Sequence, residues 1–177
     1  MAILAAAVIL VGLLTALNLF LTFGVIRRLR EHTRTLEQVA GGHQGDIMLA
    51  AGTAIGAFAA TTTTGTTVTD ATLNGPTLVG FFSPTCEPCK ERLPQFLEYA
   101  RSFDGRVLAV AVGPDADVAD LLTSLRPVAD VVVETDDGPV NKAFGVSGYP
   151  ALCLVDDGVV VASGYQIEAL PVPVPAS

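Results

Sequence analysis

The chain has 177 residues, half of them hydrophobic, which is enough for one domain of ordinary size to bury a core. Its net charge is −8: four arginines lie before residue 46, whereas the rest of the chain carries six basic and sixteen acidic side chains. An acidic body without a basic patch repels phosphate backbones, which argues against nucleic-acid binding. Three cysteines are too few for a disulfide scaffold.

Residues 1–26 are the most apolar part of the chain. No charged side chain occurs between Ile3 and Ile26, and a helix of this length, at about 1.5 Å per residue, crosses a hydrocarbon core of about 30 Å. The run is also longer than the hydrophobic region of a cleaved signal peptide. We therefore predict a single-pass transmembrane anchor over residues 1–26 and a location at the cell membrane.

Residues 27–45 are predicted to form a short juxtamembrane helix and a linker, with Gly41-Gly42 ending the helix. This segment bears on the orientation in the membrane. The positive-inside rule would keep its arginines, and the domain after them, in the cytoplasm. The family resemblance described below favours the extracytoplasmic side, so the two arguments conflict. The arginines are Arg27, Arg28, Arg30 and Arg34.

Residues 46–168 are predicted to form the folded domain, which opens with a threonine-rich stretch. Thr61–Thr64 and Thr66–Thr69 flank Gly65. β-Branched residues on both sides of a glycine favour a β-hairpin, although the same composition is also typical of a low-complexity segment.

Strands and helices are then predicted to alternate along the chain. Continuous apolar strands separated by helices predict an α/β fold, with a central mixed sheet, helices on both faces and an antiparallel strand pair at the end. Asp156-Asp157-Gly158 is typical of a tight hairpin turn. Residues 169–177 are predicted to be a disordered Pro-rich tail. The predicted strands are Thr77–Phe82, Val107–Val112, Val128–Glu134, Ala151–Val155 and Val159–Ala162, and the predicted helices are Glu87–Ser102, Asp117–Leu125 and Gly138–Phe144.

Cys86 and Cys89 lie three positions apart, where the first buried strand passes into a helix. Such a turn places the first sulfur at a helix N-terminus, where free N–H groups and the positive end of the helix dipole favour the thiolate. This is the chemistry of disulfide exchange. We predict that Cys86 is the more exposed, attacking thiolate and that Cys89, one turn further along, resolves the mixed disulfide.

Metal binding is the main alternative for this cysteine pair. A zinc site needs four ligands and the pair supplies two, while His32 and His43 lie in the juxtamembrane segment. Cys153, between Leu152 and Leu154, is predicted to be a small buried hydrophobe. No metal is therefore expected, and no cofactor other than a redox-active disulfide between Cys86 and Cys89.

The local sequence resembles a known family. Ser83-Pro84-Thr85-Cys86-Glu87-Pro88-Cys89-Lys90, followed by Leu93-Pro94 and later by Tyr149-Pro150, is similar to the membrane-anchored thioredoxin-like TlpA/ResA family. The stretch from Phe81 to Cys86 looks most like MauD, an accessory protein for methylamine dehydrogenase maturation. The resemblance covers about residues 52–165. It implies a thioredoxin-like fold, client proteins with thiols or disulfides, and an upstream electron-donor protein.

The same resemblance implies roles for residues around the dithiol. In the thioredoxin architecture the Tyr149-Pro150 loop faces the cysteines, which predicts a cis bond before Pro150. Thr85 and the backbone of Tyr149 are expected to contact an extended substrate segment. Glu87 and Lys90 are expected to tune the pKa of the dithiol, with Glu87 opposing the thiolate and Lys90 favouring it. The dipeptide between the two cysteines by itself predicts a moderately lowered thiol pKa and a reducing or isomerising protein rather than a strongly oxidising one.

The chain also departs from the family at three positions. Thr85 replaces the usual tryptophan before the first cysteine, and Gly80 occupies the place of a buried aspartate of plain thioredoxins. Arg92 stands where ResA-like proteins keep a buried glutamate. Both usual proton-handling carboxylates are absent, which leaves water or Glu87 to move protons.

Three functions stay open on this sequence. The first is a membrane-tethered thiol–disulfide oxidoreductase that reduces or isomerises disulfides in client proteins. The second is a thioredoxin-fold peroxidase, because Pro84-Thr85-Cys86 is faintly similar to peroxiredoxins, whose threonine lies three residues before the cysteine, where this chain has Ser83. The third is a non-catalytic tethered binding module.

Overall fold

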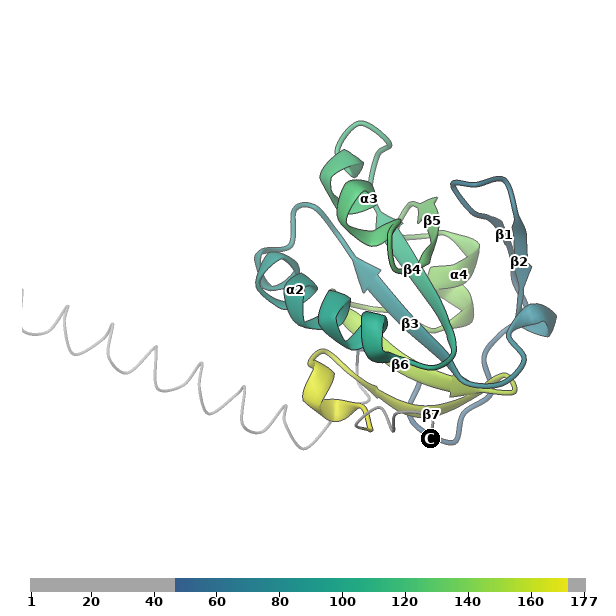
Figure 1. Ribbon diagram of the computed structural model, residues 1–177. Coiled ribbons are helices and arrows are strands. Elements are labelled where there is room, and N and C mark those ends of the chain that lie inside the picture. The colour runs from purple at the N-terminus through teal and green to yellow at the C-terminus, as the bar shows by residue number, and fades with distance from the viewer. Residues whose placement is uncertain (1–46, 172–177) are drawn as a thin grey trace, which may run out of the picture. The chain divides into compact units, whose positions relative to one another are not determined.

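The computed structural model describes residues 47–171 (Figure 1). The anchor predicted over residues 1–26, the linker over 27–45 and the end of the tail over 172–177 lie outside the described residues. Between residues 47 and 171, no helix is both long enough and apolar enough to cross a membrane.

A five-stranded mixed sheet forms the centre of the described part, with the strand order β5-β4-β3-β6-β7. β3 (Thr77–Phe82), β4 (Arg106–Val112) and β5 (Asp130–Glu134) run parallel. β6 (Ala151–Asp156) is antiparallel to β3, and β7 (Val159–Gly164) is antiparallel to β6. Every residue of β3 is buried, because this central strand has covered faces on both sides.

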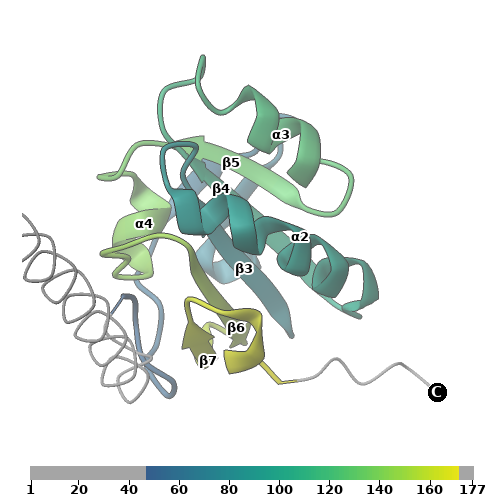
Figure 2. The same ribbon diagram turned by 90° about the vertical axis from the view of Figure 1, so that its left-hand side faces the viewer.

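The helices lie on both faces of the sheet, which confirms the predicted α/β fold. Figure 2 looks onto the face covered by α2 (Glu87–Ser102) and α3 (Ala119–Leu125), whose apolar side chains share one core with Leu78 and Phe82 of β3. The opposite face carries α4 (Pro139–Ala143), and Val79 and Phe81 point into that second core. Alternate β3 side chains therefore serve different cores, as the period of a strand requires.

The threonine-rich stretch forms the predicted hairpin. β1 (Ala59–Thr61) pairs antiparallel with β2 (Thr67–Thr69), and the 3₁₀ helix η1 (Asp70–Thr72) follows. The hairpin turn also docks on the outer strand of the sheet, because the amide of Thr63 donates to the carbonyl of Val131. This contact covers part of the β5 edge, which would otherwise offer unpaired backbone groups.

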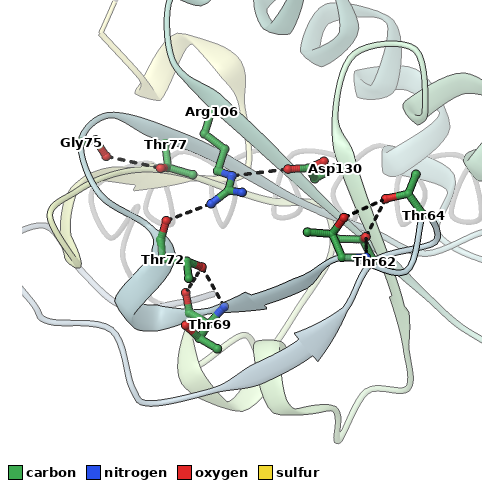
Figure 3. A network of polar contacts seen from close by, with 9 residues as sticks. Thr62, Thr64, Thr69, Thr72, Gly75, Thr77, Arg106 and Asp130 are labelled. Carbon is green, nitrogen blue, oxygen red and sulfur yellow. Dashed lines mark hydrogen bonds and ion pairs between the residues drawn. The ribbon is translucent and has the colours of Figure 1, made fainter.

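A polar network ties the hairpin region to the sheet (Figure 3). Arg106, at the start of β4, donates from Nη1 to the carbonyl of Thr72 at 2.9 Å and pairs through Nε with Asp130 at 3.4 Å. Thr77 and Arg106 are register partners at the amino ends of β3 and β4. The dithiol follows the carboxyl end of β3, whereas the contacts of Arg106 lie at the amino ends of the strands. We therefore interpret this polar network as structural.

Two elements begin later than the sequence predicts, because a local hydrogen bond competes with the regular element. α3 begins at Ala119 rather than Asp117, because the Asp117 amide donates to Pro114 in a preceding turn. β5 begins at Asp130 rather than Val128, because the amides of residues 128 and 129 donate to the carbonyl of Leu125.

The carboxyl end of the domain reaches further than predicted. A short 3₁₀ helix η2 (Ile167–Ala169) follows β7, and Leu170 is buried in the core beneath α2. The Pro-rich sequence context predicts that Leu170 lies in the disordered tail. The structure places it in the folded part, because burial of its side chain stabilises the chain up to that residue.

Candidate active site

Cys86 is the N-cap residue of α2. Its backbone is extended (φ −90°, ψ 111°), and its sulfur accepts a hydrogen bond from the amide of Cys89 at 3.2 Å. The chain turns between β3 and α2, with the Cys86 amide donating to the carbonyl of Ser83. Pro88 lies in the first helical turn, where its missing N–H is not needed. Local sequence thus suffices to place this sulfur at the helix start.

The two sulfurs differ in exposure, as predicted. Cys86 is partly exposed, whereas Cys89 is 1% exposed, and both are free thiols in this structure. Burial raises the pKa of Cys89 to about 12, and its hydrogen bond with Cys86 acts in the same direction. Cys89 is therefore a protonated thiol at neutral pH, and Cys86 is the sulfur that a client can reach.

The loop before β6 faces this dithiol. The Tyr149–Pro150 bond is cis, which confirms the predicted isomer. β6 begins at Ala151, which pairs with Phe81 near the end of β3, so the loop and the cysteines meet at the same end of the sheet. The Cys86 sulfur donates to the carbonyl oxygen of Tyr149 at 3.2 Å.

Glu87 and Lys90, in the first turn of α2, form an ion pair. Lys90 Nζ lies 3.0 Å from Glu87 Oε2, and both side chains are mostly exposed. Because their opposite charges face each other in water, their fields at the dithiol oppose each other. Thr85 is exposed and its hydroxyl lies 3.2 Å from that of Ser83. The tuning role of the ion pair and the substrate contact of Thr85 stay predictions.

Arg92 lies one helical turn after Cys89 and brings a positive charge close to the Cys89 thiol. Its guanidinium lies over the ring of Tyr165, 4.8 Å from the centroid, and Nη1 donates to the carbonyl of the same residue at 3.3 Å. Its positive charge lowers the pKa of Cys89, against the larger effect of burial. A cation thus stands where the resemblance would place a carboxylate.

Gly80 occupies the place of the buried aspartate of plain thioredoxins, and its surroundings leave no room for a side chain. A Cβ atom at this position would lie 2.7 Å from Cε2 of Phe96 and 2.8 Å from Cε2 of Phe82. The two rings pack edge to face, with centroids 5.0 Å apart. The two rings fill the space beside Gly80 that an aspartate side chain would need, and they belong to the same core as Cys89. This part of the site is therefore apolar.

Sequence reasoning missed a polar cluster behind Tyr149. The Tyr149 hydroxyl lies 3.0 Å from Asp136 Oδ1 and 3.1 Å from Asn141 Oδ1. Asn141 in turn donates from Nδ2 to Glu134 Oε1 at 2.8 Å. Asn141 is 1% exposed and Glu134 is half-buried. No local pattern marks these residues, because their partners are brought together by the ends of β5, α4 and the loop before β6.

Cys153 is the third free cysteine of the described residues. It is fully buried in β6, as predicted, and burial raises the pKa of its thiol. Within residues 47–171 no group of three or more histidine, cysteine or carboxylate side chains gathers as metal ligands would.

A mixed sheet covered on both faces, a dithiol at a helix start and a cis-proline loop opposite it define a thioredoxin-like protein. Comparison with known families agrees with this class. The model of the AhpC/TSA family matches residues 51–163, and the chain belongs to that family.

Individual relatives point the same way. A thioredoxin of Haemophilus influenzae is 32% identical over 96 residues, which are 54% of this chain and 69% of that protein. The thioredoxin domain of a thiol-disulfide oxidoreductase from Bacteroides vulgatus has a TM-score of 0.58 at 22% identity, over 69% of this chain and 93% of that chain. A thio-disulfide isomerase from Thermus thermophilus has a TM-score of 0.55 at 22% identity, over 67% and 87%. These two structures show the thioredoxin-like fold.

Proposed function

We propose that the protein is a thiol–disulfide oxidoreductase that reduces or isomerises disulfides in client proteins. One observation carries this proposal. The partly exposed sulfur of Cys86 lies at a helix start, accepts the amide of Cys89 at 3.2 Å and faces the carbonyl of Tyr149 at the cis-proline loop. The relationship to a thioredoxin supports it.

The reaction proceeds in two exchange steps. The Cys86 thiolate attacks one sulfur of a client disulfide, forming a mixed disulfide and releasing the other client sulfur, which takes up a proton. Cys89 then loses its proton and attacks the Cys86 sulfur, which releases the second client thiol and leaves a Cys86–Cys89 disulfide. Two electrons have passed to the client, and an electron-donor protein with a dithiol must reduce the new disulfide.

Insulin reduction by the purified full chain tests this proposal. We expect turnover with dithiothreitol as the donor, loss of turnover in Cys86→Ser, and accumulation of a covalent client complex in Cys89→Ser. Cys153→Ala is the matched control, since a client cannot reach this fully buried thiol and its loss should leave turnover intact. Unchanged turnover in Cys86→Ser would refute the assignment.

Membrane tethering belongs to the same proposal. It is supported by the uncharged run from Ile3 to Ile26 and by the resemblance to the TlpA/ResA family and MauD, which also favours exported clients. A fusion of alkaline phosphatase, active only outside the cytoplasm, after Ser177 tests it. Phosphatase activity in the membrane fraction would support the extracytoplasmic side. A cytoplasmic result would replace exported clients with cytosolic ones, as the juxtamembrane arginines suggest.

Two alternative functions, a peroxidase and a binding module, can be distinguished with the same purified proteins. Rapid consumption of hydrogen peroxide that depends on Cys86, without insulin turnover, would favour a thioredoxin-fold peroxidase. Absence of both activities would favour a tethered binding module with an inactive dithiol.

A further inference from the structure

We propose that Asn141, oriented by Glu134, is a positioning residue that holds Tyr149 so that its carbonyl meets the sulfur of Cys86 and an incoming client segment. This inference rests on the proposed oxidoreductase function and deepens it. It assigns a role in client recognition to two residues outside the dithiol motif.

The orientation of the Asn141 amide is determined by its acceptors. Nδ2 donates to Glu134 Oε1 at 2.8 Å and to the carbonyl of Thr135 at 3.3 Å, so both of its N–H groups are used. The oxygen end must therefore face the other way, where the Tyr149 hydroxyl donates to it at 3.1 Å. Because Asn141 is almost fully buried, water cannot easily replace these bonds.

Glu134 is itself held by the backbone of α4. Its Oε1 accepts from the Asn141 amide at 2.6 Å, and its Oε2 accepts from the Val140 amide at 3.1 Å. Gly138 permits this approach, because a Cβ atom there would lie 2.3 Å from Cδ of Glu134. The carboxylate thus joins the end of β5 to the first turn of α4 and gives Asn141 a rigid support.

Tyr149 connects Asn141 to the sulfur of Cys86, because it contacts both of them. Its ring is half-buried and packs against the hydrophobic cores of both sheet faces. Its single hydroxyl proton is shared between Asn141 Oδ1 and Asp136 Oδ1, and its carbonyl accepts from Cys86 at 3.2 Å. The residue is therefore restrained at both ends, and Asn141 is the buried one of its two hydroxyl partners.

Restraining the carbonyl of Tyr149 should affect the binding only of a substrate that forms a hydrogen bond with it. An extended peptide beside the dithiol pairs its amides with the loop backbone, and holding that backbone in advance lowers the entropy cost of binding. A small disulfide without peptide groups makes no such contact. Loosening Tyr149 should therefore slow exchange with a protein disulfide and spare exchange with a small one.

The test compares insulin with bis(2-hydroxyethyl) disulfide, using the full chain and the variants Asn141→Ala and Tyr149→Phe. Tyr149→Phe retains the ring and the carbonyl and removes only the hydroxyl. For both variants we expect kcat/KM for insulin to fall about tenfold, mainly through KM, and the rate with the small disulfide to stay within about twofold. The losses should be less than additive in the double variant, because both changes break the contact between Asn141 and the Tyr149 hydroxyl.

Lys142→Ala is the matched control in α4, since Lys142 is exposed and its ion pair, at 3.8 Å, is with Asp137, which is also exposed. Equal losses with both substrates, or no loss with insulin, would overturn the inference. If Asn141→Ala does not fold, Tyr149→Phe decides the same question. A wild-type chain that turns over neither substrate would overturn the proposed function itself, and this inference with it.

Discussion

At the scale of single residues, the two sulfurs of the dithiol are chemically unequal. Cys86 is partly exposed at the helix start, and Cys89 is buried one turn below it. Burial raises the pKa of Cys89 to about 12, and the thiolate is the attacking species. The second exchange step should therefore be limited by deprotonation of Cys89.

This asymmetry predicts the pH dependence of the resolving step. With 5,5′-dithiobis(2-nitrobenzoate), the first phase forms a mixed disulfide on Cys86 and releases one nitrothiobenzoate, and the second phase releases another as Cys89 attacks the Cys86 sulfur. Below the raised pKa of Cys89 its thiolate fraction grows with pH, so the rate of the second phase should rise about tenfold per pH unit between pH 6 and 9. Stopped-flow absorbance measures both phases, and Cys89→Ser should lack the second. A second phase independent of pH would contradict the prediction.

Arg92 gives a second prediction at this scale. Its positive charge lowers the pKa of Cys89, so Arg92→Met should raise that pKa further and slow the second phase by about two- to tenfold at pH 8. Arg92→Lys should retain most of the rate because it keeps the charge.

Arg101→Met is the matched control, since it removes an exposed positive charge at the other end of α2. An equal effect of both substitutions would point to net charge rather than to the position of Arg92.

At the scale of elements, the contact between β3 and α2 determines the character of the site. The rings of Phe82 and Phe96 occupy the space beside Gly80, so no side chain can be added there without displacing them. The absence of a carboxylate is therefore coupled to the packing of the helix that carries both cysteines. The rings of Phe82 and Phe96 therefore pack in the core that contains Cys89, where a plain thioredoxin has a proton-handling carboxylate.

Gly80→Ala should destabilise the protein by about 1–3 kcal/mol, because its Cβ would overlap both rings in a close-packed core. Urea unfolding measures this as a lower midpoint with an unchanged slope. Phe96→Leu should recover part of the loss in the Gly80→Ala background, although it is destabilising by itself. An unchanged midpoint in Gly80→Ala would show that the rings can move aside at no cost.

At the scale of the whole molecule, two hydrophobic cores share one sheet. β6 lies between β3 and β7, and Cys153 in its middle is fully buried. The Cys153 side chain lies in the core that α4 covers, so exposing this thiol requires that core to open. The third cysteine is therefore a reporter of global stability.

Cys153 should react with a thiol reagent more than about 10³-fold more slowly in the native protein than in the unfolded chain, since domains of this kind have unfolding free energies of about 5–15 kcal/mol. Its labelling rate should rise with urea in parallel with global unfolding. Mass spectrometry of a Cys86→Ser/Cys89→Ser variant isolates the signal of the third cysteine. Fast labelling that is insensitive to urea would reveal local opening of β6.

Local signals account for much of this molecule. The apolar run Thr77–Phe82, the helix Glu87–Ser102 and the Asp157-Gly158 turn were predicted with the observed positions, because each depends on neighbours in the chain. Boundaries failed where a hydrogen bond from an adjacent turn competed with the element, as at Asp117 and Val128.

The sequence by itself determined that two sulfurs stand at the start of a helix after a buried strand, because three-residue spacing and strand periodicity are local properties. The family resemblance placed the Tyr149-Pro150 loop opposite these sulfurs. Only the tertiary structure decided the contacts around them: the hydrogen bond from Cys86 to the carbonyl of Tyr149, the cation of Arg92, and the support of the loop by Asn141 and Glu134. These contacts join segments up to 73 residues apart. Their geometry depends on strand order and on the packing of both cores, which no local pattern encodes.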